Sequence, residues 1–305
     1  METINIIFSS DDNYAQYMGV SICSIFENKI DGYLINIYVL DGGISKENII
    51  KLTILEEKYS FEIKFIQVNS LIFNEFYTSR HITKAAYYRI IIPNLFPNLK
   101  KVLYLDCDTI VIGNVLELYK ININNYYFAA VEDLYMGQAR HNDLNIPLAA
   151  KYFNSGVMLI NLERWRNNNL SQLILNFIKN SKIKLEFHDQ DAINANTFNK
   201  WLNLPLKFNY MSTLFNKNDL NNKKQNILII HYTGLKPWNY FSHNYFNTYY
   251  FYYLSKTPWK NKKYINKSFK NTAIIFLESI ILFMFPKKVI NIIKKIKLTL
   301  GIKFY

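Results

Sequence analysis

Short apolar runs alternate with helical patterns through the first half of this 305-residue chain, and this alternation restricts the fold more than any other feature. Residues 4–8 predict a buried strand, turn residues follow, and apolar side chains then recur at helical spacing over residues 15–25. Ser45 is expected to cap a second helix. Further strands are predicted at residues 34–40, 61–68, 102–105, 156–160 and 227–230. We therefore expect an α/β fold with a mostly parallel central sheet flanked by helices.

Acidic residues follow two of these predicted strands at the point where each strand ends. Asp11 and Asp12 come after the first strand, and Asp106 and Asp108 come directly after residues 102–105. Ligands of open α/β sheets bind at the carboxyl ends of the strands. Both acidic pairs are therefore expected at the ligand-binding edge of the sheet.

Asp106 and Asp108 have the spacing of two metal ligands, because residues two apart in an extended segment point to the same side. Two carboxylates suit Mn²⁺ or Mg²⁺ with open positions for phosphate oxygens. His231 follows another predicted strand and offers a third ligand, while Lys236 could neutralise a phosphate. Taken alone, His231 and Lys236 are better explained as a strand-end histidine and a solvated lysine. Gly234 could let the backbone approach a ligand closely, or it could equally be an ordinary turn glycine.

Other polar residues have roles that the local sequence leaves open. Asp189 precedes a predicted helix, so it could cap that helix, contribute to a site, or do both. The side-chain amide of Asn154 could stabilise a turn, or it could bind a hydroxyl group of a ligand. His81, Arg89 and Asp133 are isolated polar residues to which local sequence assigns nothing.

The sequence lacks the usual cofactor and hydrolase fingerprints. It contains no G-x-G-x-x-G, no G-x-x-x-x-G-K-[ST], no H-E-x-x-H and no G-x-S-x-G. These absences make a nicotinamide dehydrogenase, a P-loop nucleotidase, a zincin protease and an α/β-hydrolase poor candidates. Two cysteines, Cys23 and Cys107, cannot form a disulfide framework or a four-cysteine zinc site, which favours a reducing compartment.

The positive charge is concentrated near the C-terminal end. The formal net charge is +13, and residues 256–305 carry twelve lysines, no arginine and one glutamate, which leaves +2 for residues 1–255. We predict one domain over residues 1–255 and a basic helical extension over residues 256–305. Residues 273–285 form an apolar run too short to span a bilayer.

Residues 289–300 have the pattern of a helix that lies in a membrane interface, since apolar positions recur at helical spacing with lysines between them. We expect the extension to dock on an anionic inner-leaflet surface, and a helix folded back on the domain is the alternative. Nucleic acid is not expected as a partner. The N-terminal residues lack the basic segment of a secretory signal, so we expect a cytoplasmic protein attached peripherally to the membrane.

Seven motifs, taken in order, resemble family 8 of the retaining nucleotide-sugar glycosyltransferases, and in particular the bacterial lipooligosaccharide and lipopolysaccharide α-galactosyltransferases. They are F-S-S-D-D-N-Y at 8–14, V-L-D-G-G-I-S at 39–45, R-H-I-T at 80–83 with Arg89, K-V-L-Y-L-D-C-D at 101–108, F-N-S-G-V-M-L-I-N-L at 153–162, H-D-Q-D-A-I-N at 188–194 and H-Y-T-G-L-K-P-W at 231–238. Residues 135–153 and 208–225 match none of them, and acceptor choice is expected in such variable loops.

The resemblance implies a GT-A fold, with Mn²⁺ (or Mg²⁺) held by Asp106, Asp108 and His231. Asp189 and Gln190 are the implied catalytic residues. The residues implied around a UDP-sugar are Ser9, Asp11, Asn13 and Tyr14 at the uridine, Gly234 and Lys236 at the diphosphate, Arg89, Asn154, Asp189 and Gln190 at the sugar, and His81 and Asp133 near the sugar or the acceptor.

The implied reaction moves a hexose, galactose in preference to glucose, from a UDP-sugar to a hydroxyl of a lipooligosaccharide or lipopolysaccharide glycan. Gln190 is a poor nucleophile, so we favour front-face attack with the leaving phosphate as base. A sugar-nucleotide pyrophosphorylase is one alternative, but it needs a glycine-rich basic loop where this chain has Ser9-Ser10-Asp11-Asp12. A non-catalytic membrane-binding protein is another, and it explains the extension but none of the motifs.

Overall fold

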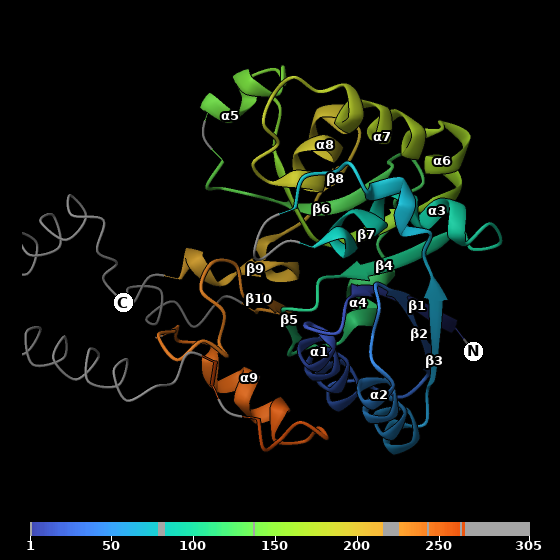
Figure 1. Ribbon diagram of the computed structural model, residues 1–305, viewed down its shortest axis with the longest axis vertical. Helices are drawn as coiled ribbons and strands as arrows, with labels where there is room; N and C mark the ends of the chain where they lie inside the picture. Colours follow the sequence, from blue (N-terminus) through green and yellow to red (C-terminus); the bar gives the residue numbers. More distant parts are fainter. Residues whose placement is uncertain are drawn as a thin grey trace, which may run out of the picture.

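The computed structural model describes residues 2–78, 83–136, 138–215, 226–242, 244–262, 264 and 265 (Figure 1). The expected membrane helix at residues 289–300 and the apolar run at residues 273–285 therefore lie outside the described residues. In the part of the chain that is described, no helix is both long enough and apolar enough to cross a bilayer.

The central sheet has seven strands in the order β3-β2-β1-β4-β7-β6-β8. Their bounds are β1 (Glu2–Ser10), β2 (Tyr33–Asp41), β3 (Glu62–Gln67), β4 (Lys101–Leu105), β6 (Phe128–Glu132), β7 (Phe153–Asn161) and β8 (Leu202–Asn203). Strand β7 runs antiparallel to β4 and β6, and all other neighbouring pairs are parallel. The prediction of a mostly parallel sheet is confirmed, and β7 is its one reversed strand.

A second, three-stranded sheet lies beside the first, in the order β5-β10-β9. Its strands are β5 (Thr109–Val111), β9 (Tyr210–Met211) and β10 (Ile229–His231). The register of the antiparallel β5–β10 pair places His231 opposite Thr109. His231 is thereby brought next to the chain that leaves β4, although more than 100 residues separate the two in sequence.

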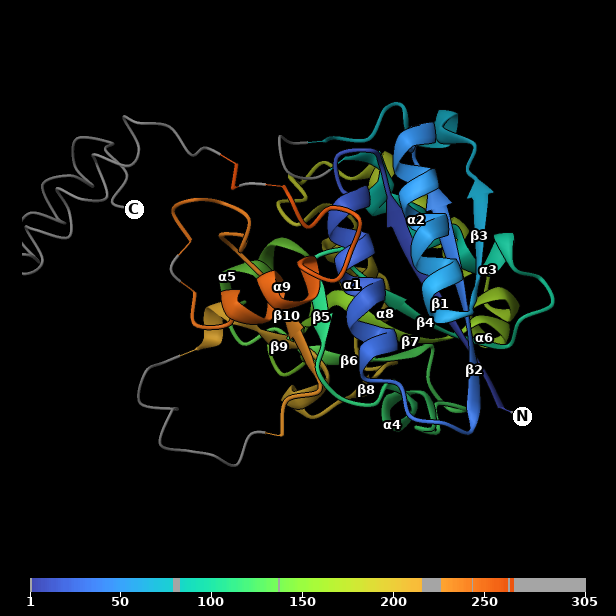
Figure 2. The same cartoon turned by 90° about the horizontal axis from the view of Figure 1, so that it is seen from below.

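Helices cover both faces of the central sheet (Figures 1 and 2). The helices are α1 (Ala15–Glu27), α2 (Lys46–Tyr59), α3 (Ile92–Leu95), α4 (Val115–Tyr119), α5 (Gln138–Asp143), α6 (Leu162–Asn167), α7 (Leu170–Asn180), α8 (His188–Thr197) and α9 (Asn247–Leu254), with 3₁₀ segments η1 (Ser70–Phe73), η2 (Lys84–Ile91), η3 (Leu206–Phe208) and η4 (Ser212–Leu214). Successive residues of β1 point to opposite faces, so Ile6 packs with α1 and α2, while Ile7 joins the core formed with α6, α7 and α8.

Helix α2 begins as predicted, because the side chain of Ser45 accepts a hydrogen bond from the backbone N–H of Asn48. The first residues after position 255 pack on the same helices. Trp259 is 2% exposed, its indole N–H donates to Asn48 Oδ1, and its ring lies against Gly19 of α1. The described start of the basic extension is therefore attached to the domain.

Candidate metal and sugar-nucleotide site

The two sheets meet where β4 ends and β5 begins, and three potential metal ligands gather there. One ligand atom from each of Asp106, Asp108 and His231 lies within 4.8 Å of the others. His231 Nε2 is 3.3 Å from Asp108 Oδ1 and 3.9 Å from Asp106 Oδ2. Asp108 and His231 are buried and Asp106 is partly exposed, which leaves one open side. Two carboxylates and one imidazole fit Mn²⁺ or Mg²⁺ with positions left for a ligand.

Strand β7 approaches this cluster so closely that it has no space for a side chain at Gly156. A Cβ atom there would lie 2.2 Å from His231 Cε1 and 2.8 Å from Asp106 Oδ2. The backbone of Gly156 also accepts a hydrogen bond from Asp106 N–H. Gly156 therefore lets the metal ligands pack directly against the central sheet.

The buried guanidinium of Arg89 links the cluster to α8. It donates to Asp106 Oδ1 at 2.9 Å and to the carbonyl of Ser155 at 2.7 Å, and its Nε lies 2.9 Å from Asp189 Oδ2. It also stacks over the ring of Tyr104, which itself donates to Asp106 Oδ1. Burial alone would lower the pKa of Arg89, but the carboxylates of Asp106 and Asp189 outweigh burial and raise it.

Asp189 does not cap α8, so the capping interpretation is wrong. Phe187 occupies the N-cap position, and Asp189 lies in the first turn with its side chain turned toward Arg89. The Nε–H of Arg89 donates to the carbonyl of Ala86, so Asp189 Oδ2 lies close to a cation yet receives no hydrogen bond from any residue that the structure describes. Burial raises the pKa of Asp189 to about 7, against the opposing charge of Arg89 and with a further contribution from Asp106.

Gln190, Asn154 and Asp133 gather along the first residues of β7. Gln190 Oε1 accepts hydrogen bonds from both the backbone N–H and the hydroxyl of Ser155. Asn154 Nδ2 donates to Asp133 Oδ2 at 3.3 Å. The structure thus joins Asp133 to Asn154 and Gln190 to Ser155, the two residues of β7 that directly precede Gly156.

The loop after β10 brings Lys236 to the cluster, through a turn in which Gly234 has a φ of +72°. The Lys236 ammonium donates to Asp108 Oδ2 and, at 2.7 Å, to the carbonyl of Tyr232. Burial opposes ionisation of Asp108, but the ammonium of Lys236 holds its pKa well below its usual range. The predicted phosphate-binding lysine is thus adjacent to the predicted metal ligands.

The predicted uridine-binding residues lie where β1 ends. Ser9 is buried and donates to the carbonyl of Ala85, Asp11 Oδ1 accepts from Tyr14 N–H, and Asn13 is exposed. Burial, with a further contribution from the charge of Asp108, raises the pKa of Tyr14, and its ring lies edge-on to those of Tyr17 and Trp238. Asp12 is turned toward the start of α2, where it accepts hydrogen bonds from Ser45 N–H and the Asn48 side chain. His81 lies outside the described residues.

Asn209 is a site residue that sequence reasoning missed. It is fully buried and contacts both His231 and Asn154. Its only signal in the sequence is a polar residue within the apolar stretch L-K-F-N-Y-M, which matches no motif.

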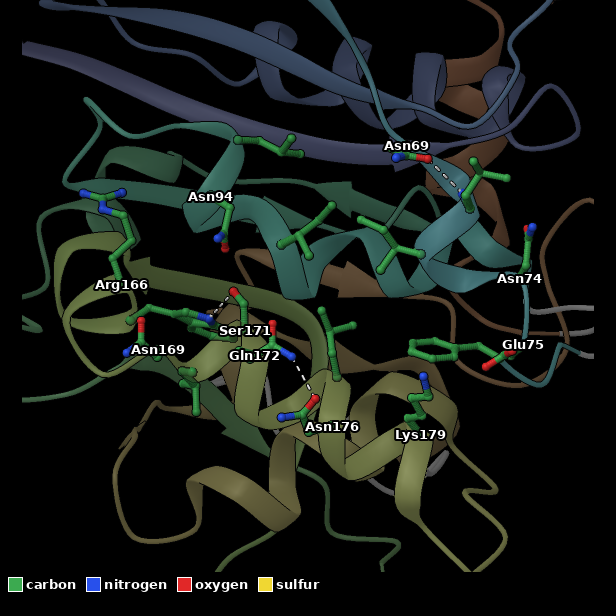
Figure 3. A pocket seen from close by; sticks show the side chains of 18 residues that line it. Asn69, Asn74, Glu75, Asn94, Arg166, Asn169, Ser171, Gln172, Asn176 and Lys179 are labelled. Atoms are coloured by element: carbon green, nitrogen blue, oxygen red, sulfur yellow. Dashed lines mark hydrogen bonds between the residues drawn. The ribbon is translucent and has the colours of Figure 1, made fainter.

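A separate pocket of about 1100 Å³ lies between η1, α3, α6 and α7 (Figure 3). Its polar lining includes Asn69, Asn94, Gln172 and Asn176. None of the predicted site residues lines it. The metal-ligand cluster is therefore not part of this pocket.

Comparisons with known proteins agree with this geometry. The sequence pattern of glycosyl transferase family 8 matches residues 5–242. General stress protein A of Bacillus subtilis is 36% identical over 85% of this chain and 95% of its own length. A lipopolysaccharide 1,2-glucosyltransferase of Escherichia coli is 30% identical, over 86% of this chain and 81% of that protein.

A solved structure shows a similar fold. The galactosyltransferase LgtC, in complex with donor and acceptor sugar analogues, superposes with a TM-score of 0.75 at 26% identity, over 84% of this chain and 96% of that chain. The predicted GT-A fold is thereby confirmed, with its mixed sheet and flanking helices. On the evidence of sequence, fold and the residues at the sheet edge, the chain belongs to glycosyltransferase family 8.

Proposed function

We propose that this chain is a metal-dependent, retaining hexosyltransferase whose donor is a UDP-sugar. One observation carries the proposal: Asp106, Asp108 and His231 converge beside Lys236 at the edge where β4 ends. Diphosphate oxygens are ligands that both a hard divalent cation and an ammonium group bind. The site therefore has the charge and the ligand set that a nucleotide diphosphate requires.

In this proposal the end of β1 receives the uridine and the loop after β10 receives the diphosphate. The donor sugar then lies over the start of β7 and the start of α8. The proposal assigns Ser9, Asp11, Asn13 and Tyr14 to the uridine, Gly234 and Lys236 to the diphosphate, and Arg89, Asn154, Asp189 and Gln190 to the sugar. Asp133 is proposed near the sugar or the acceptor, and so is His81, which lies outside the described residues.

The proposed reaction retains the configuration of the anomeric carbon. The acceptor oxygen forms a bond to that carbon while the bond from the carbon to the β-phosphate oxygen breaks, and its electron pair stays on the phosphate. The acceptor proton passes to the leaving phosphate oxygen on the same face. A bound cation supplies Lewis-acid stabilisation of the leaving diphosphate. Lys236 adds a fixed positive charge at the same place.

The contacts of Gln190 and Asp189 favour front-face attack over a covalent intermediate. Gln190 is an amide, and its Oε1 already accepts two hydrogen bonds from Ser155. Asp189 is held against the Arg89 cation, which reduces the nucleophilicity of its carboxylate. Both side chains are instead suited to stabilise the positive charge of an oxocarbenium-like transition state.

We infer that the acceptor is a hydroxyl of a lipooligosaccharide or lipopolysaccharide glycan. Two of the relatives support this acceptor class, the lipopolysaccharide 1,2-glucosyltransferase of Escherichia coli and a lipopolysaccharide 1,3-galactosyltransferase of Salmonella typhimurium. The proposed place of reaction is the inner face of the cytoplasmic membrane, where the lysines of residues 266–305 would meet anionic lipid.

An assay of UDP release tests the donor and the metal together. UDP-galactose, UDP-glucose and UDP-N-acetylglucosamine are compared in Mn²⁺, with and without lipid-linked oligosaccharide, and with excess EDTA. We expect release from a UDP-hexose that needs the metal and increases with acceptor, with UDP-galactose the preferred donor. Release of pyrophosphate from UTP and a sugar phosphate would instead identify a pyrophosphorylase.

Vesicle sedimentation tests the membrane part of the proposal. The chain should be ended after Ile265, because Trp259 packs on α1 and an earlier stop would expose its binding site on Gly19. We expect the shortened protein to lose binding to anionic vesicles and to keep hydrolysis of UDP-sugar. Equal binding by both forms, or no binding of the full chain at moderate salt, would refute docking through residues 266–305.

A further inference from the structure

A chain of buried hydrogen bonds runs from the metal-ligand cluster to the sugar side of the site. His231 Nδ1 lies 3.0 Å from Asn209 Oδ1, and Asn209 Nδ2 lies 2.9 Å from Asn154 Oδ1. Asn154 in turn contacts Asp133. Asn209 is fully buried and His231 is 4% exposed, so bulk water does not compete for their hydrogen bonds.

The direction of every hydrogen bond in this chain is fixed at its Asn154 end. The backbone N–H of Gly156 can only donate, and it donates to Asn154 Oδ1 at 3.1 Å. A carboxylate such as Asp133 accepts from the other atom of the same amide, Nδ2. The orientation of the Asn154 amide is therefore set from both sides, independently of Asn209.

This orientation decides which atom of Asn209 faces His231. Because Asn154 Oδ1 is an acceptor, the atom of Asn209 that faces it has to be the Nδ2 donor. Asn209 Oδ1 then faces His231 and can only accept. The proton between Asn209 and His231 is consequently carried by Nδ1 of the imidazole.

We propose that Asn209 is a positioning residue that keeps the proton of His231 on Nδ1, so that Nε2 presents a lone pair to the metal site formed with Asp106 and Asp108. The opposite tautomer would direct an N–H at the cation and would be held there by Asp108, 3.3 Å from Nε2. The inference deepens the proposed function, because it rests on His231 being a metal ligand. It assigns a role to a residue outside every motif.

Variants of Asn209 separate positioning from simple packing. Asn209→Leu keeps the approximate volume and removes the acceptor, whereas Asn209→Asp keeps an acceptor for Nδ1–H but places an oxygen against Asn154 Oδ1. Both should lower the melting temperature. Asn194→Leu is the matched control, since Asn194 is also fully buried, bonds only to the backbone and does not contact His231. If a leucine variant fails to fold, Asn209→Ala and Asn194→Ala replace the pair.

The first measurement is the tautomer of His231 in the full chain, by NMR of ¹⁵N-labelled histidine without metal at pH 9, where an ordinary imidazole is neutral. The chain has five histidines, so His231→Gln identifies the signal. We expect a protonated Nδ1 in the wild type, in Asn209→Asp and in Asn194→Leu, and a signal of the Nε2–H tautomer in Asn209→Leu. An unprotonated Nδ1 in the wild type would overturn the inference, and so would an unchanged signal in Asn209→Leu.

The second measurement is Mn²⁺ affinity, from the electron paramagnetic resonance signal of the free ion. Loss of a partner that orients a metal-bound histidine typically weakens binding about 10- to 100-fold, and we expect this loss in Asn209→Leu only. If affinity follows melting temperature across all variants, Asn209 is structural and the inference fails. If the wild type binds no Mn²⁺, the proposed function fails, while the NMR result still decides the role of Asn209.

Discussion

The ammonium of Lys236 forms an ion pair with Asp108, the carboxylate that His231 also faces. Lys236, which is suited to bind a diphosphate, is thereby paired with Asp108, which is suited to bind a metal ion. A divalent cation bound here would compete with Lys236 for Asp108, and a diphosphate would attract Lys236 away from it. We therefore predict that metal binding and nucleotide binding are coupled through this one lysine.

Replacement of Lys236 by Gln should therefore change the two affinities in opposite directions. Without nucleotide, Mn²⁺ should bind more tightly, by up to about tenfold or ~1.4 kcal/mol, because the competing ammonium is gone. UDP should bind more weakly in the presence of Mn²⁺, since a phosphate contact is lost. Titration calorimetry measures both, and a decrease in Mn²⁺ affinity without UDP would contradict the competition.

The variant Asp108→Asn should fold and lose turnover. An amide is an uncharged and poorer ligand for a hard cation, and loss of several kcal/mol of transition-state stabilisation lowers the rate by more than about 100-fold. The rate of UDP release is the measurement. Asp143→Asn is the control, because Asp143 is exposed on α5 and, within the described part of the chain, forms an ion pair only with Arg140. Near-normal turnover of Asp108→Asn would exclude Asp108 as a metal ligand.

The substitution Gly156→Ala should disturb the proposed metal ligands by steric collision, because there is no space for a Cβ atom at this position. Its Cβ would collide with the His231 ring, and overpacking of this kind costs about 1–3 kcal/mol of unfolding free energy. We expect weaker Mn²⁺ binding together with the loss of stability. At Gly113 the three atoms nearest to an added Cβ all belong to Leu228, the closest being Cγ at 3.2 Å, so Gly113→Ala should leave Mn²⁺ affinity unchanged. Equal Mn²⁺ affinity in both variants would show that the collision is relieved elsewhere.

Asp189 should make the stability of the protein depend on pH. Its pKa is raised by burial from 3.8 to about 7, so the folded state holds a proton that the unfolded state releases at lower pH. Stability from this group is complete below about pH 4 and is lost as the pH rises through 7. Asn cannot ionise, so Asp189→Asn should gain stability relative to the wild type between these values. Chemical denaturation at pH 4, 6 and 8 tests the sign, and parallel profiles would contradict it.

The same variant separates a catalytic from a structural role of Asp189. Since Phe187 holds the N-cap position, no cap is lost, and cap loss would in any case cost only about 1 kcal/mol. A large fall in turnover of folded Asp189→Asn would support a role at the donor sugar. Retention of most of the rate would leave Asp189 as a partner of Arg89 only.

Strong local patterns predicted much of the fold. The buried strand β1, helix α2 with its Ser45 cap, and β4 with the carboxylates that follow it are all visible as apolar runs and turn residues. The direction of β7 was not predictable, because a run that is buried on both faces looks the same in a parallel and an antiparallel strand. Strands β5 and β9 have three and two residues, too few to show any period.

Contacts within the site were predictable when both residues belong to one sequence motif. They were not predictable when the fold brings together residues that are far apart in the sequence. Asp106 and Asp108 follow one strand, so their proximity is local. The contact of Asn209 with His231 spans 22 residues and depends on the pairing of β9 with β10, which no local pattern encodes. Asp189 was misassigned as a possible cap because its partner, Arg89, lies 100 residues earlier and was visible only as an isolated charge.

The small sheet β5-β10-β9 has a consequence for how this chain can vary. Asp108 directly precedes β5, and His231 is the last residue of β10, which pairs with β5; a slip of one residue would turn His231 to the other side. The ligands are therefore held in register by backbone pairing, whatever the length of the loop between β9 and β10. We therefore expect changes in the length of that loop, in evolution or in a library of designed variants, to leave the relative positions of Asp108 and His231 unchanged.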